Sequence, residues 1–312
     1  MSRAGSVVTL APFVIVLALA IALALAGLLS APRIASAPIT SGAPTPAVVA
    51  APSTAAPTTA SRANDAAEML RVHNELRVAV GATPVRGDER VSAAAQRHAE
   101  YLAGSGASGH DESAGAPGFT GASVADRLAA QGYPASTASE VATSFSTGTD
   151  GVRSLWVLPY HRLGLMHPHA VVAGWGHADV AGRSATVGVL VYDFASPSPD
   201  RVRSPAPGQR VPGSWSGEES PDVLPPGAAR PVGYPVMVVF DNARPAELLS
   251  ARVTDPGGGE VVTYVVPQLY ERDYVAIVPG TALAPGARYH VRLELSVAGS
   301  ALVDEWEFET ER

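Results

Sequence analysis

The stretch "RGDERVSAAAQRHAEYLAGSG", residues 86–106, has the pattern of one amphipathic helix with a signal at each end. Asp88 is a suitable N-cap, because its carboxylate can accept a hydrogen bond from a backbone N–H of the first turn. Gly104 is a typical stop. The apolar side chains between them recur at helical spacing: Val91, Ala95, Ala99 and Leu102. His98 shares this stripe, so we expect it to be a packing residue.

Two further helices are predicted on either side of this stretch. Residues 66–80 carry apolar side chains at helical spacing after a cap at Asn64-Asp65, and residues 122–133 repeat the pattern. "SATVGVLVYDF", residues 184–194, alternates instead and predicts a buried strand. Helices come first and strands last, which is typical of the α+β class rather than of a repeating βαβ sheet.

The order of these motifs resembles a known family. "HNELRVAVGATPVRGDERVSAAAQRHAEYLAGSG" is followed by "GH", "ASEVA", "LWVLPYHRLGLMHPHAVVAGWG" and "VGVLVYDF". The series is similar to the CAP superfamily of cysteine-rich secretory, antigen 5 and pathogenesis-related proteins, in its bacterial form with an SCP domain. The resemblance implies an α-β-α sandwich with a concave cleft, which we expect over residues 64–196.

The family's cleft holds two histidines and two acids, and three of these positions are matched. The resemblance implies that His110, Glu140 and His161 line the cleft. The second acid, which follows a tryptophan in the family, has no counterpart after Trp156. Two nearby acids, Asp111 and Glu112, could take its place.

The three residues could form a chemical site in either of two ways. Alternatively, the two histidines are ordinary solvated loop residues. Two neutral imidazoles and one carboxylate are the ligand set of an open zinc site, so His110, Glu140 and His161 are candidate ligands of Zn or another divalent metal. Without a metal they could form an acid–base cluster. We expect the other histidines to be structural, with His167-Pro168-His169 in a surface turn.

Residues 204–312 predict an all-β domain. Short strand-like runs are separated by turn residues, and "RYHVRLELSV", residues 288–297, alternates as a strand with one buried face does. The region resembles the bacterial Ig-like sandwich domains of surface proteins, which act as spacers or adhesive modules. A Pro/Gly-rich boundary near residues 197–212 offers little to bury, so we expect two independently folding domains.

The N-terminal part predicts export. Residues 7–29 are free of charge and long enough to span a bilayer. We expect residues 1–30 to be a signal anchor, or alternatively a cleaved signal peptide, and residues 31–63, rich in Ala, Pro, Ser and Thr, to be an extended linker. The folded parts are then extracytoplasmic, either secreted or anchored to the membrane by the N-terminus.

The composition argues against several classes of function. A net charge of −7 without a basic cluster argues against nucleic acid as a partner. The absence of cysteine excludes disulfides, thiolate metal sites and Cys nucleophiles. "GSWSG", residues 213–217, has Trp215 where a nucleophile elbow needs serine.

We therefore expect an exported cell-envelope protein whose cleft binds a lipid-like or wall-derived small ligand. Two alternatives stay open: a metal-assisted hydrolase of peptide or wall substrates with Glu140 as base, and a structural or adhesive surface protein without catalysis. The sequence favours a binding protein over an enzyme without deciding between them.

Overall fold

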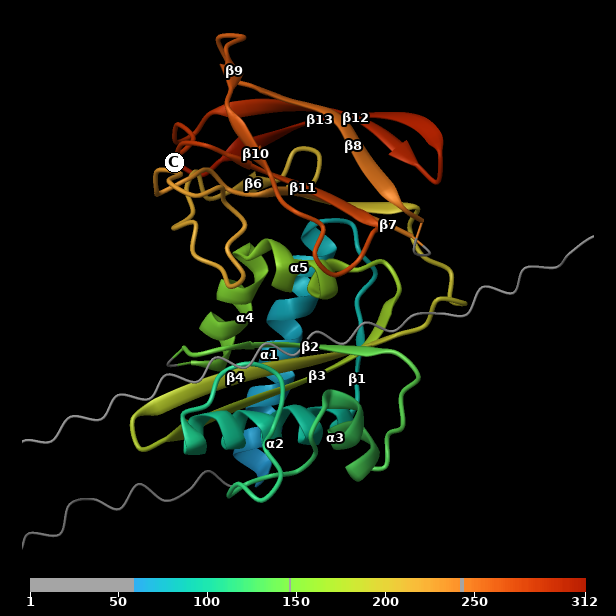
Figure 1. Ribbon diagram of the computed structural model, residues 1–312, viewed down its shortest axis with the longest axis vertical. Coiled ribbons are helices and arrows are strands. Elements are labelled where there is room, and N and C mark those ends of the chain that lie inside the picture. The colour runs from blue at the N-terminus through green and yellow to red at the C-terminus, as the bar shows by residue number, and fades with distance from the viewer. Residues whose placement is uncertain (1–58, 146, 242–243) are drawn as a thin grey trace, which may run out of the picture. The chain divides into compact units, whose positions relative to one another are not determined.

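The computed structural model describes residues 59–312 except residue 146 and residues 242–243 (Figure 1). The predicted signal segment, and the predicted linker up to residue 58, lie outside the described residues. The described residues belong to one compact unit. Within the described part of the chain, no helix is both long enough and apolar enough to cross a membrane.

The first half of this unit, residues 59–192, is the α/β region. Its elements in chain order are α1 (Thr59–Ala79), β1 (Arg86–Gly87), α2 (Glu89–Ser105), α3 (Val124–Ala130), β2 (Ala138–Thr143), α4 (Gly148–Val157), α5 (Pro159–Met166), β3 (Ala170–Val180) and β4 (Arg183–Tyr192). The strands form one sheet in the order β1-β3-β4-β2. The predicted mixture of helices and strands is confirmed.

Helices cover both faces of this sheet. Successive side chains of a strand point to opposite faces, so each strand contributes to two cores. Val187 and Val189 of β4 pack into a core with α2 and α3. Leu190 of β4 and Trp175 of β3 pack into another core with α1, α4 and α5. Figure 1 shows α2 and α3 on one side of the strands and α4 and α5 on the other. Strand β4 is therefore buried along most of its length instead of alternating.

Helix α2 follows the predicted pattern closely. Asp88 is the N-cap and accepts a hydrogen bond from the Arg90 amide. The helix runs past Gly104 and ends at Gly106, whose φ of 72° is left-handed. A side-chain carbon at Gly174 of β3 would lie 2.2 Å from the Ser92 amide nitrogen. The glycine thus allows α2 to pack directly on the strand backbone.

The second half, residues 201–312, is the β region. Its strands are β5 (Arg201–Ser204), β6 (Arg210–Val211), β7 (Val236–Phe240), β8 (Ala246–Thr254), β9 (Glu260–Val261), β10 (Thr263–Val265), β11 (Tyr274–Pro279), β12 (Arg288–Val297) and β13 (Ser300–Thr310). They form two sheets, ordered β10-β11-β7-β5 and β6-β13-β12-β8-β9. Strand β12 alternates between buried and partly exposed positions after Arg288, as its sequence predicts.

Strands β7 and β11 differ from β12 because every one of their residues is buried. Val236 and Val238 of β7 face a core shared with β8, β12 and β13. Met237 and Val239 face the core of α1, α4 and α5. The β region therefore packs on the α/β region through a continuous core. The Pro/Gly-rich boundary buries more than expected, because Val202 and Ser204 of β5 are inaccessible to solvent.

Candidate functional site

His110 lies in the loop between α2 and α3, and its imidazole reaches Glu140 on β2. The Nδ1 atom of His110 lies 3.2 Å from Oε1 of Glu140, 30 residues away in sequence. The imidazole is 51% exposed, whereas the Glu140 side chain is 1% exposed. The pair thus presents an accessible imidazole whose orientation is fixed by a buried carboxylate.

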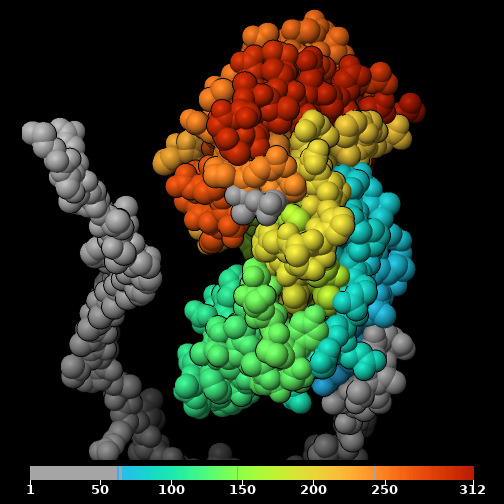
Figure 2. Space-filling model, turned by 90° about the vertical axis from the view of Figure 1, so that its right-hand side faces the viewer, coloured from blue at the N-terminus to red at the C-terminus, as the bar shows by residue number. Residues whose placement is uncertain are grey.

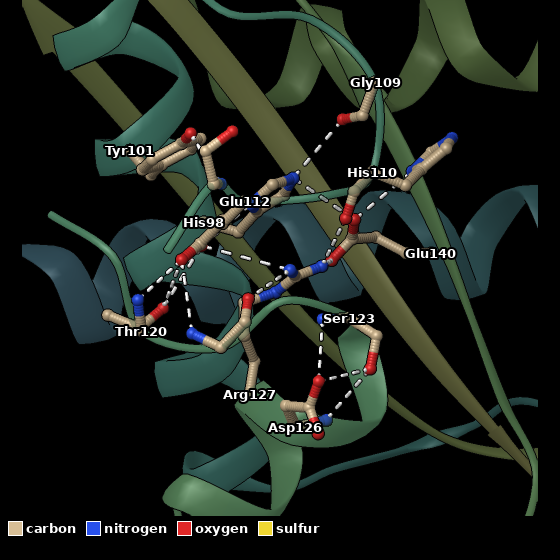
Figure 3. A network of polar contacts seen from close by, with 12 residues as sticks. His98, Tyr101, Gly109, His110, Glu112, Thr120, Ser123, Asp126, Arg127 and Glu140 are labelled. Carbon is tan, nitrogen blue, oxygen red and sulfur yellow. Dashed lines mark hydrogen bonds and ion pairs between the residues drawn. The ribbon is translucent and has the colours of Figure 1, made fainter. Parts of the chain in front are cut away.

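Arg127 of α3 neutralises the Glu140 carboxylate (Figure 3). Its NH2 group donates to Glu140 Oε2 at 2.7 Å and to the His110 backbone oxygen at 2.9 Å. The same guanidinium donates to the Gly121 backbone oxygen at 3.2 Å. A buried carboxylate requires such compensation because the protein interior solvates an isolated charge poorly. Arg127 therefore holds both Glu140 and the backbone of the His110 loop.

His98 and Glu112 extend the network beneath the loop. His98 Nδ1 lies 3.0 Å from Glu112 Oε1, and Nε2 lies 3.3 Å from Glu140 Oε1. Glu112 also accepts hydrogen bonds from the Thr120 amide at 2.6 Å and the Gly121 amide at 3.3 Å. Figure 3 shows His98 between the two carboxylates. The histidine predicted to be a packing residue thus contributes to the polar support of the site.

His161 lies on α5 and pairs with an acid of the connection between β6 and β7. Its Nδ1 atom is 2.8 Å from Glu219 Oε1, which also accepts from the backbone amides of Tyr160 and His161. Helix α5 has no side-chain cap of its own, since Leu158 precedes it. Glu219 therefore caps α5, where the free amides and the helix dipole favour a negative charge.

His167 and His169 are both buried, so the predicted surface turn is wrong. The His169 amide donates to Nδ1 of His167 at 3.1 Å, which leaves the proton of the neutral ring on Nε2. That Nε2 atom lies 3.2 Å from Oδ2 of Asp273 on the β region. The turn is buried because the β region covers it.

A cavity of about 380 Å³ lies beside these pairs. Its walls include all three sequence-predicted residues, His110, Glu140 and His161. The β region contributes Tyr270, Asp273 and other side chains. Figure 2 shows the surface hollowed between the orange residues of the β region and the green residues of the α/β region. The volume falls in the range of small-molecule sites, roughly 300–1,000 Å³.

The walls combine aromatic rings with polar groups. Tyr160 and Tyr270 meet edge to face with ring centroids 5.3 Å apart, and Tyr192 stacks on Phe194 at 6.1 Å. Burial raises the pKa of Tyr192 to about 12, so its hydroxyl stays protonated at neutral pH. The hydroxyl group forms a hydrogen bond with Ser139. The cavity can therefore surround an apolar body and still offer donors and acceptors.

The three candidate metal ligands are each in contact with other side chains. Among residues 59–312, apart from the three that the structure leaves out, no three His, Cys, Asp or Glu side chains converge as metal ligands would. Glu140 is held by Arg127 and His110, and His161 is held by Glu219. A metal at His110, Glu140 and His161 stays a prediction, and no step below depends on one.

Comparison with known families addresses the α/β region. Residues 70–192 match the family model described as the cysteine-rich secretory protein family, CAP. The match supports a CAP domain. The CAP domain includes His110, Glu140 and His161, whereas Glu219 and Asp273 lie beyond its last matched residue.

Three solved structures illustrate what the chain is similar to. No curated protein matches the sequence. An extracellular protein with an SCP domain from Bacillus anthracis is 14% identical, with 45% of each chain covered and a TM-score of 0.37. An outer surface protein of Borrelia burgdorferi is 14% identical over 40% of this chain and 90% of its own, with a TM-score of 0.35. CopC from Methylosinus trichosporium is 18% identical over 35% of this chain and 88% of its own, with a TM-score of 0.25.

Sequence reasoning missed the acids of the β region. Glu219 and Asp273 lie 58 and 106 residues from the histidines that they contact. No local motif marks either acid. The signal that could have been used was the unbroken apolar run of β7 and β11, since strands without alternation must be covered on both faces. Arg127 was also missed, although an arginine beside an acid-bearing strand is the usual partner of a buried carboxylate.

Proposed function

We propose that this protein acts outside the cytoplasm and binds a small ligand with an apolar body in the cavity between the CAP domain and the β region. The observation that carries the proposal is the open cavity of about 380 Å³, which side chains of both regions line. Phe194 and Tyr270 remain 40% and 60% exposed at its walls. Exposed aromatic rings around a hollow are typical of a binding site.

The export signal read from the sequence and the CAP family match support the placement outside the cytoplasm. In the proposed role His110 is an accessible hydrogen-bonding group at one end of the cavity. Glu140 and Arg127 fix its loop and its ring. The β region, for which the Ig-like sandwich fold stays a prediction, acts as the second wall of the site rather than as a spacer only.

The two alternatives from the sequence have less support. A hydrolase with Glu140 as base would need a free carboxylate oxygen, yet Oε2 is bound to Arg127 and Oε1 contacts His110 and His98. A structural or adhesive protein would need no cavity, and packing would be expected to fill it. The open volume favours a ligand-binding protein.

Blocking the cavity tests the proposal. Thr137 lines the cavity, its side chain is exposed, and its backbone oxygen accepts a hydrogen bond from the Tyr192 amide. The substitution Thr137→Trp should therefore fill the mouth without disturbing the fold. We expect the full chain to bind 1-hexanol saturably by calorimetry, and Thr137→Trp to remove that binding.

The matched control is Ala301→Trp, which adds the same ring to an exposed position of β13. It should leave hexanol binding unchanged. Equal hexanol binding by the wild type and Thr137→Trp, or no saturable binding at all, would refute the proposed site.

A further inference from the structure

The cavity carries buried negative charge on the side that the β region provides. Asp273 lines the cavity and is only 2% exposed. Its Oδ2 atom lies 3.2 Å from Nε2 of His167, whose Nδ1 accepts a hydrogen bond from the His169 amide. Its Oδ1 atom has no hydrogen-bond partner among the described residues. A buried carboxylate oxygen without a donor is costly, and a ligand donor would satisfy it.

Apart from the histidines, the ionisable side chains that line the cavity with a carboxylate are Glu140, Glu271 and Asp273. Glu271 lines the cavity and is exposed. Neither Arg nor Lys occurs among the lining residues in the described part of the chain. Four arginines lie behind or beside the walls. Arg162 is buried on α5, and Arg272 lies between Glu271 and Asp273 in the chain. Arg127 is bound to Glu140, and Arg77 donates to the backbone oxygens of Thr83, Leu165 and His167.

The aromatic walls suit a cation as well as an apolar chain. Tyr160, Tyr192, Phe194 and Tyr270 all line the cavity. The faces of aromatic rings attract ammonium groups within about 6 Å of the ring centroid. A carboxylate, an adjacent acid and several ring faces together are complementary to an organic cation with N–H donors.

Resting on the proposed binding function, we propose that the ligand carries a protonated amine, whose positive charge pairs with the Asp273 carboxylate while its apolar part contacts the aromatic walls. The amine offsets the buried negative charge and supplies N–H donors on the acidic side of the cavity. A neutral or anionic ligand of the same shape lacks one or both of these effects.

Three probes of equal chain length test this ligand class on the full chain: hexylammonium, 1-hexanol and hexanoate at neutral pH. Subtracting the titration of Thr137→Trp removes uptake at other surfaces. We expect hexylammonium to bind about tenfold more tightly than hexanol, as one charge-assisted hydrogen bond allows, and hexanoate to bind most weakly. Asp273→Asn should abolish the preference for the amine.

Two further variants keep the test decisive. Glu271→Gln, at an exposed position, should reduce the preference for the amine even if Asp273→Asn does not fold. Asp255→Asn, in a turn away from the cavity, should leave it unchanged. Equal affinities for hexylammonium and hexanol, both lost in Thr137→Trp, would overturn the amine while leaving the binding site intact. Loss of all binding would instead refute the site itself.

Discussion

The Glu140 side of the cavity and the Asp273 side both bury carboxylates, but they compensate the charges differently. Glu140 and its network lie wholly within the CAP domain, where Arg127 supplies a guanidinium at 2.7 Å. Asp273 and Glu219 come from the β region and contact histidines of the CAP domain. Each retains one oxygen without a partner among the described residues, Asp273 Oδ1 and Glu219 Oε2.

The two sides of the cavity therefore have different roles: one holds the His110 loop in place, and the other contacts the ligand. Glu140 is paired with the Arg127 guanidinium and contacts two imidazoles, so both of its oxygens have partners, and the same guanidinium holds the loop that carries His110. A carboxylate that contacts only an imidazole through one oxygen keeps hydrogen-bonding capacity on the other. The CAP side thus fixes geometry, and the β-region side carries buried carboxylate charge without a guanidinium partner.

The largest effect should come from removing the guanidinium. Arg127→Met leaves Glu140 buried without a counter-charge, and Glu112 loses a nearby cation as well. We expect the free energy of unfolding to fall by about 3–5 kcal/mol, measured by denaturant titration. Adding Glu140→Gln should recover part of the loss. Arg90→Met, at an exposed surface pair, is the control, and equal stability of the two Arg variants would contradict the comparison.

The shared core should be the next most sensitive feature. Met237 of β7 is fully buried against the CAP domain. Met237→Ala should lower the free energy of unfolding by about 2–5 kcal/mol, because it leaves a cavity. Hydrogen exchange should show β4 and β12 losing protection together. Leu249→Ala, at an exposed position of β8, is the control. Loss of protection confined to β12 would show that the two regions unfold independently, as the sequence had suggested.

The free energy of unfolding in acid should depend on His73, a buried residue that belongs to neither carboxylate cluster. Burial, with a smaller effect of Arg77, lowers the pKa of His73 from its ordinary 6.5 to about 3. The unfolded chain therefore binds this proton first as the pH falls, and stability is lost between pH 6.5 and about 3. His73→Gln should remove up to about 1.4 kcal/mol of stability change per pH unit in this window. Identical pH profiles of unfolding in the two proteins would exclude this contribution.

The smallest effect on stability should come from His110. Its ring is half exposed, so His110→Ala should change the free energy of unfolding by less than about 0.5 kcal/mol. Zinc titration of the same variant tests the predicted metal. A stoichiometric zinc site that is lost in His110→Ala but kept in His290→Ala would support ligation by His110. Indistinguishable titrations of all three proteins would refute it.

The local sequence pattern was sufficient to predict several helices and strands of the fold. Asp88 caps α2, and β12 alternates, because capping and strand periodicity depend on neighbouring residues alone. The start of α1 was less predictable. The structure begins this helix at Thr59, five residues before the expected cap at Asn64. Helix ends are decided by small differences between competing caps.

The sequence by itself determined the helices and strands that are amphipathic and, through the family resemblance, His110, Glu140 and His161 as cavity residues. Only the tertiary structure decided that Glu219 caps α5 and that Asp273 faces His167. Periodicity records which face of an element is buried, but not what covers it. Any acid can satisfy a free helix amide or an imidazole proton, so the choice among distant acids is made by the packing of β7 and β11 against the CAP domain.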